Sequence, residues 1–125
     1  MIVALGLLLV MTAIVIVVVV FNRKEPDVVL QGVDYYNQKK YESQLDDCLK
    51  VISEDPNYTI AYYNAACCYA QLSQSGKALE MLEQALILDR NEGRAYGMRE
   101  SAEKDPELDP VKGNPAYVLM MERYR

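Results

Sequence analysis

The hydrophobic pattern divides the chain into two parts. Residues 1–21 form a continuous apolar run without a charged side chain, and all 13 Lys and Arg and all 18 Asp and Glu follow it. At about 1.5 Å per helical residue the run spans roughly 31 Å, close to the thickness of a bilayer's hydrocarbon core. The pattern predicts a transmembrane anchor helix over residues 1–22, followed by a juxtamembrane linker at 23–25.

A cleaved signal peptide is the alternative for this segment. It would need a basic start and a small-residue cleavage site, and the run has neither. Arg23 and Lys24 follow the run directly, so the positive-inside rule places the rest of the chain on the cytoplasmic side, or on an equivalent side such as the stroma. The prediction is a single-pass membrane protein that contacts the lipid bilayer through residues 1–22.

The second part has a helical period. Apolar positions recur at spacings of three and four, which is the pattern of one helix face. The first such set is Tyr62, Ala65, Ala66 and Tyr69, and the second is Ala78, Leu82 and Ala85. Small residues at Ala66 and Ala78 allow two antiparallel helices to approach closely. This pattern predicts a pair of packed helices over residues 59–90.

This segment resembles a tetratricopeptide repeat (TPR), a 34-residue helix–turn–helix unit. The aromatic and small residues of both helices occupy the places that the family pattern gives them, and Asp55, Pro56 and Asn57 resemble the turn before a repeat. The resemblance implies an all-α fold, namely a short TPR superhelix of αα-hairpins behind the N-terminal transmembrane helix. It also implies a protein-binding module.

A weaker copy of the repeat lies 34 residues earlier. Gly32, Tyr35 and Tyr41 agree with the family, whereas Gln31 and Gln44 stand where a large apolar and a small residue are usual. We therefore expect a second helix pair within residues 26–58.

A partial copy follows the central repeat. Asn91 is a suitable N-cap for a helix that begins at residues 94–96, and Asp105-Pro106 should end that helix. Asn114 and Pro115 then predict the start of a short closing helix. The expected TPR domain covers residues 26–125, with repeats at 26–58 and 59–90 and a partial repeat with its closing helix at 91–125.

In this family the first helices of the repeats line a groove. Carried over position by position, the resemblance implies a partner-binding groove for an amphipathic helix or an extended peptide. The alternative is that the closing helix fills the groove. The implied lining residues are Val29, Val33, Tyr36, Asn37, Tyr63, Cys67, Ala70, Gln71, Arg94, Gly97 and Ser101.

The composition argues against an enzyme, and we expect no cofactor and no metal. The chain has no His, which is the commonest general base and metal ligand. Its three Cys are too few for a disulfide framework, and we expect them to be buried or half-buried. The net charge of −5 excludes an electrostatic preference for nucleic acid.

Three further charged features have plain interpretations. Only Asn64 and Arg94 match the five-residue clamp with which some TPR proteins hold chaperone tails, so chaperone binding is rejected. Asp105, Glu107 and Asp109 are interpreted as turn residues. Four acidic residues form either a patch for a basic partner or an ordinary solvated helix face. They are Asp46, Asp47, Glu54 and Asp55.

Three functions follow from the anchor and the repeat. The first is a membrane-anchored interaction module, an assembly factor or scaffold whose partner belongs to a membrane protein complex. The second is a permanent small structural subunit of such a complex. The third is a receptor for targeting sequences.

Overall fold

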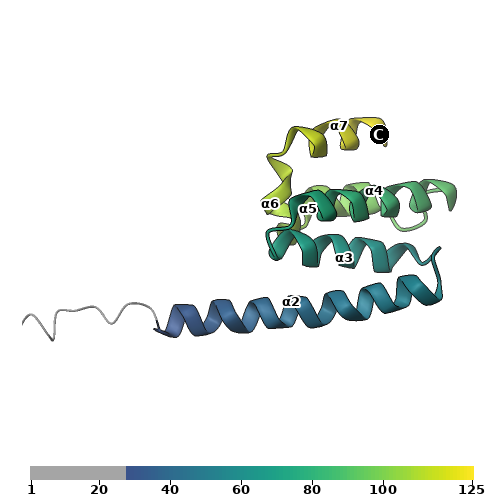
Figure 1. The fold of residues 1–125 in the computed structure, drawn as a ribbon. Coiled ribbons are helices and arrows are strands. Elements are labelled where there is room, and N and C mark those ends of the chain that lie inside the picture. The colour runs from purple at the N-terminus through teal and green to yellow at the C-terminus, as the bar shows by residue number, and fades with distance from the viewer. Residues whose placement is uncertain (1–27) are drawn as a thin grey trace, which may run out of the picture. The chain divides into compact units, whose positions relative to one another are not determined.

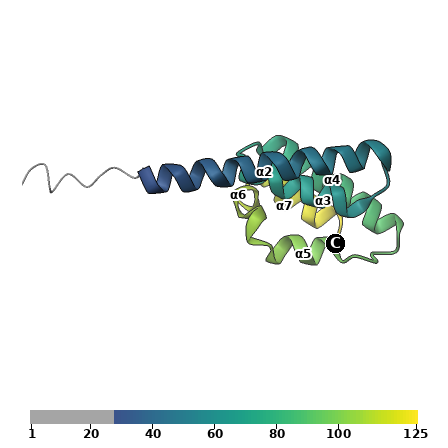
Figure 2. The same ribbon diagram turned by 90° about the horizontal axis from the view of Figure 1, so that it is seen from below.

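The computed structural model describes residues 28–125, with side chains from Asp34 onward, and Tyr35–Arg125 forms one compact unit. Every regular element in this range is helical, which confirms the all-α expectation for it. The elements are α2 (Val28–Glu54), α3 (Thr59–Gln71), α4 (Ser75–Asn91), α5 (Met98–Lys104), the 3-10 turn η1 (Pro106–Leu108), α6 (Asp109–Lys112) and α7 (Pro115–Arg123). Figure 1 shows α2, α3, α4 and α7 in that order, and Figure 2 shows α2 in front of the other helices when the unit is seen from below.

The hairpin of α3 and α4 lies at the centre of the unit. The alanines that the sequence placed on the facing sides, Ala65, Ala66, Ala78 and Ala85, are all buried, and Leu82 fills the space beside them. Ser73 has a φ of 59° and turns the chain between the two helices, while the amide of Gln74 donates to the carbonyl of Tyr69 at 2.8 Å. The predicted helix pair over residues 59–90 is therefore confirmed.

Residues Val28–Glu54 form one continuous helix of 27 residues, so the prediction of two helices within 26–58 is wrong. The stretch from Asn37 to Tyr41 contains neither Gly nor Pro, and nothing there breaks the helix. Among the described side chains of α2, from Asp34 to Glu54, one stripe packs on the core, and it consists of Tyr41, Leu45, Cys48 and Ile52. The division of the chain into repeats at 58 and 90 stays a prediction.

The helix expected from residue 94 begins later, because α4 continues to Asn91 and α5 starts at Met98. Asn91 is therefore the last residue of a helix and not an N-cap. Gly93, Arg94 and Gly97 all have positive φ, which excludes a regular helix between them. The buried carboxylate of Asp89 accepts from the amides of Tyr96 and Met98 at 2.9 and 3.0 Å, and so fixes the start of α5.

The C-terminal helix signals are confirmed. Helix α5 ends at Lys104, immediately before Asp105-Pro106. The side chain of Asn114 accepts from the amide of Ala116 at 2.9 Å, and Pro115 opens α7. Both features follow from the local chemistry of capping residues and proline.

No helix within residues 28–125 is long and apolar enough to cross a bilayer. This finding corrects the predicted localisation, a single-pass membrane protein with its domain on the cytoplasmic or stromal side. The anchor predicted for residues 1–22 and the linker at 23–25 lie outside the residues that the structure describes.

Candidate functional site: a polar cavity beside α3

The α3 residues predicted to line a groove face the chain's own turn after α5. Cys67 and Ala70 are buried, and Tyr63 and Gln71 are half-buried. The turn formed by η1 and α6 covers this side of α3, and its Leu108 and Val111 are fully buried. The sequence left open that the closing helix fills the groove, but the segment that packs here is η1 with α6.

Polar contacts join this turn to α3. The Tyr63 hydroxyl donates to an oxygen of Asp105 at 2.8 Å, and the Gln71 amide donates to the carbonyl of Glu107 at 2.8 Å. The Cys67 thiol lies 3.7 Å from the same Asp105 oxygen. Lys112 of α6 donates to the Asp105 carbonyl at 2.8 Å, so Asp105 is bonded to both α3 and α6.

The pKa values of these groups report their burial. Burial raises the pKa of the Tyr63 hydroxyl above its usual range, and the hydrogen bond to Asp105 raises it further. Burial and the nearby charge of Asp105 raise the pKa of the Cys67 thiol in the same direction. Both groups are therefore protonated at neutral pH, and Cys67 is not an activated nucleophile.

The other predicted groove residues do not gather around this point. Tyr36 and Asn37 are exposed on α2, and Ser101 is exposed on α5. Arg94 donates to the carbonyl of Arg125 at 2.9 Å, and Gly97 lies at the start of α5. Val29 and Val33 belong to α2, but their side chains lie outside the described set. As a partner-binding surface, the eleven residues stay a prediction.

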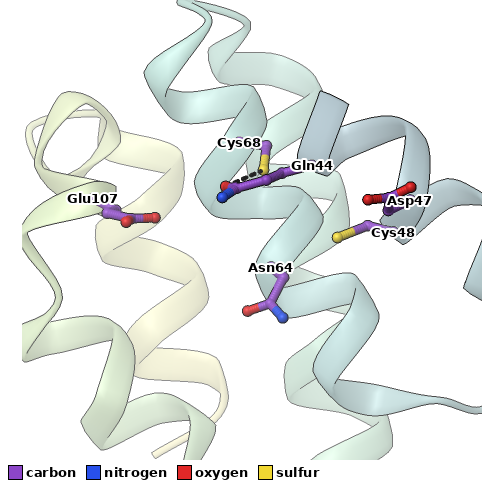
Figure 3. Close-up of a pocket in the computed structure, with 6 residues that line it drawn as sticks. All are labelled: Gln44, Asp47, Cys48, Asn64, Cys68 and Glu107. Atoms are coloured by element: carbon purple, nitrogen blue, oxygen red, sulfur yellow. Dashed lines mark hydrogen bonds between the residues drawn. The ribbon is translucent and has the colours of Figure 1, made fainter. Parts of the chain in front are cut away.

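A cavity of about 390 Å³ lies between α2, α3 and η1. Helices α2 and α3 carry two of its walls, and Glu107 borders it from the turn. Gln44 and Glu107 extend toward one another from opposite sides (Figure 3). The lining residues are Gln44, Asp47, Cys48, Asn64, Cys68 and Glu107.

The wall of the cavity offers hydrogen-bonding groups and negative charge. Within residues 34–125, the side chains of Asp47, Asn64 and Glu107 make no hydrogen bond or ion pair. The Cys68 thiol lies 4.0 Å from the Gln44 oxygen. Burial raises the pKa of the Cys68 thiol to about 11, with smaller contributions from the neighbouring Cys48 and Glu107, so the floor is a neutral thiol. Such a site can accept a cationic or hydrogen-bond-donating side chain.

Two features of the sequence fall at this cavity. Gln44 stands where the family has a small residue, and Asp47 belongs to the acidic set that was considered as a patch for a basic partner. Asp105 was interpreted as a turn residue, although it also binds Tyr63. The expectation for the thiols is confirmed, because Cys48 is half-buried and Cys67 and Cys68 are buried. The described residues contain no cluster of three or more metal-ligating side chains.

Comparison with known proteins identifies the repeat. Residues 48–80, which include the end of α2, all of α3 and the start of α4, match the family model of the tetratricopeptide repeat. The chain is similar to a chloroplastic protein of Arabidopsis thaliana, with 26% identity over 97 residues. The match covers 75% of this chain but only 27% of that relative. No solved structure gives a significant match.

The family match includes part of the cavity wall. Cys48, Asn64 and Cys68 lie within the matched residues, whereas Gln44, Asp47 and Glu107 lie outside them. Proteins built from this repeat are typically interaction modules and not enzymes. The chain therefore contains a tetratricopeptide repeat at residues 48–80, in a helical unit suited to binding other proteins.

Proposed function

We propose that the chain binds a segment of a partner protein in the cavity between α2, α3 and η1. One observation carries this proposal: Asp47, Asn64 and Glu107 line the same cavity, and none is paired within residues 34–125. Unpaired polar groups around a recess are available to a ligand without breaking an existing bond.

The chemistry of the wall selects a partner segment with a basic side chain. Asp47 and Glu107 supply carboxylates, while Gln44 and Asn64 supply amide oxygens. A guanidinium or ammonium group would bind to both kinds of acceptor, and hydrogen bonds to ionised groups are the stronger class. Of the α3 residues predicted to line a groove, Gln71 contributes indirectly to this proposal. Its hydrogen bond to the Glu107 carbonyl holds the turn that carries the Glu107 side chain.

The finer part of the proposal is an assembly factor or scaffold. The described residues form a helical unit with a recess lined by unpaired polar side chains, and this supports the holding of a partner segment. A permanent subunit would bind the same segment but remain with the finished complex. Stoichiometric recovery of the chain in that complex would favour the permanent subunit over the assembly factor.

Site-specific photocrosslinking in the full chain tests the binding site. A benzoylphenylalanine at position 64 replaces the exposed Asn64 at the cavity mouth, and the same residue at position 91 replaces the exposed Asn91 as a matched control. We expect a defined adduct with one partner from position 64 and none from position 91. Mass spectrometry then identifies the partner.

A charge-reversal variant tests whether the crosslink at position 64 depends on the two carboxylates of the cavity. Asp47→Lys combined with Glu107→Lys reverses both cavity charges at exposed positions, so the fold should persist. The adduct from position 64 should disappear in this variant but remain in Asp46→Lys, whose residue is exposed on α2 outside the cavity lining. An adduct that survives the double reversal would refute the proposed site.

A further inference from the structure

Two pairs of large apolar side chains are strongly exposed at separate places in the unit. Tyr35 and Tyr36 on α2 are 64% and 69% exposed, and Val118 and Leu119 on α7 are 52% and 66% exposed. These are the highest values among the large hydrophobic residues of the part that the structure describes. Single exposed apolar residues are ordinary, but adjacent pairs form patches.

The α7 pair borders a recess. A cavity of about 360 Å³ lies between α4 and α7, with Leu79, Ala116, Leu119 and Met120 as its apolar wall and Glu80 and Glu83 among its polar residues. Glu83 binds Arg123 at 2.8 Å, whereas Glu80 has no ion pair within residues 34–125. The recess therefore combines an apolar floor with an edge formed by the Glu83–Arg123 ion pair and by Glu80, whose charge is not paired within residues 34–125.

The exposed tyrosine pair of α2 lies beside two basic side chains. Lys39 and Lys40 follow Tyr35 and Tyr36 by about one helical turn. Lys39 lies 5.7 Å from the Tyr35 ring centre and binds Glu42 at 2.8 Å, both within α2. This segment is apolar and basic, and so it complements the recess between α4 and α7 in both respects.

The position of the two surfaces matters because of how helical repeats stack. Each repeat buries an apolar face against its neighbour, and the end units of a stack need a polar outer face. Here α2 and α7, the outermost helices of the layers in Figure 1, carry the two exposed apolar pairs. Both outer helices of the described stack therefore present exposed large apolar side chains.

We infer that a second copy of this chain docks the Tyr35–Lys40 segment of its α2 into the recess between α4 and α7. The tyrosine rings cover Leu119 and the apolar wall, and Lys39 or Lys40 reaches Glu80. The two surfaces of one contact differ, so a docked pair of chains keeps one free donor surface and one free acceptor surface. The contact is head-to-tail, and copies add one after another as protein concentration rises.

Crosslinking between copies of the full chain tests this inference. Equal amounts of unlabelled and ¹⁵N-labelled chain are mixed and treated with a carbodiimide, which joins a Lys amine to a neighbouring carboxylate. Mass spectrometry then finds peptides that join one labelled and one unlabelled chain. We expect such mixed peptides to join Lys39 or Lys40 to Glu80 or Glu83.

An apolar variant checks that the crosslink reports docking. Leu119→Asp places a charge in the recess but keeps every Lys and Glu of the contact, and its position is exposed, so the fold should persist. We expect at least about a tenfold lower yield of the mixed peptide, the result of losing about 1.4 kcal/mol. Tyr58→Asp, at an exposed tyrosine before α3, is the matched control and should leave the yield unchanged.

Two results would overturn the inference. One is the absence of mixed-isotope peptides between these residues at every concentration. The other is a yield that Leu119→Asp leaves equal to that of Tyr58→Asp. Circular dichroism of both variants accompanies the assay, so a loss of crosslinking counts only where the helical content is unchanged.

Discussion

The hydroxyl of Tyr63 donates a 2.8 Å hydrogen bond to the carboxylate of Asp105, 42 residues later in the chain. The Asp105 carboxylate also accepts a hydrogen bond from the amide of Glu107 at 2.9 Å and so caps the start of the turn η1. One side chain thus ends α5, forms the turn and attaches it to α3. The position of Glu107, and with it one wall of the cavity, depends on this arrangement.

Tyr63→Phe should lower the free energy of unfolding by about 1.5–3 kcal/mol, because it removes a partly buried hydrogen bond to a charged group. Urea denaturation followed by circular dichroism measures the change. Tyr62→Phe is the matched control, since its hydroxyl donates to the Pro56 carbonyl at an exposed position, and it should cost less. Equal losses would contradict a special role for the Tyr63–Asp105 bond.

The same bond predicts a pH dependence. The pKa of Tyr63 in the folded chain lies above its ordinary value of 10.0, mainly because of burial. Its contribution to stability is therefore complete below pH 10 and is lost as pH rises, since the unfolded tyrosine ionises first. The stability difference between the wild-type chain and Tyr63→Phe should shrink above pH 10. A difference that stays constant to high pH would contradict the assignment.

Asp89 should be the most sensitive acidic residue of α4. It is 4% exposed and accepts from two backbone amides, those of Tyr96 and Met98. Asp89→Ala leaves both donors unpaired, and we expect a loss of about 2–4 kcal/mol. Hydrogen exchange at residues 96 and 98 should accelerate at the same time. Asp46→Ala, at an exposed residue of α2, should change neither quantity.

The three thiols should react with iodoacetamide in a fixed order at pH 8. Cys48 is half-buried and should react first, whereas the buried Cys67 and Cys68 should react only when the chain is unfolded. The raised pKa of Cys68, about 11, further reduces its thiolate at this pH. Mass spectrometry of the digested chain measures each site, and prior modification of Cys67 would contradict the closure of α3 by the turn.

The parts of the fold that depend on local patterns could be predicted from the sequence. The spacing of Ala65, Ala66, Ala78 and Ala85 indicated the α3–α4 hairpin because close packing of two helices requires small residues at the contact. Asn114 and Pro115 indicated the start of α7 because capping is a matter of neighbouring residues.

Long-range contacts could not be predicted in the same way. The start of α5 depends on Asp89, which belongs to α4. The Asp89 carboxylate accepts a hydrogen bond from the amide of Met98, the first residue of α5, across a loop with positive φ angles. The turn that covers one side of α3 is held there by Asp105 and Leu108. The sequence indicated a turn at these residues but not that it packs on α3. For α2, the weaker repeat copy predicted two helices within residues 26–58, whereas the absence of Gly or Pro between Asn37 and Tyr41 favours the one continuous helix that is observed.

The most direct test of the central claim is the dissociation constant of the partner identified by crosslinking from position 64. It is measured with the full chain and with Asp47→Asn combined with Glu107→Gln, which removes both charges but preserves shape. Loss of one charge-assisted contact costs at least about 1.5 kcal/mol, so we predict binding weakened by about tenfold or more. Equal affinities for the wild type and this variant, with Asp46→Asn as control, would contradict the account.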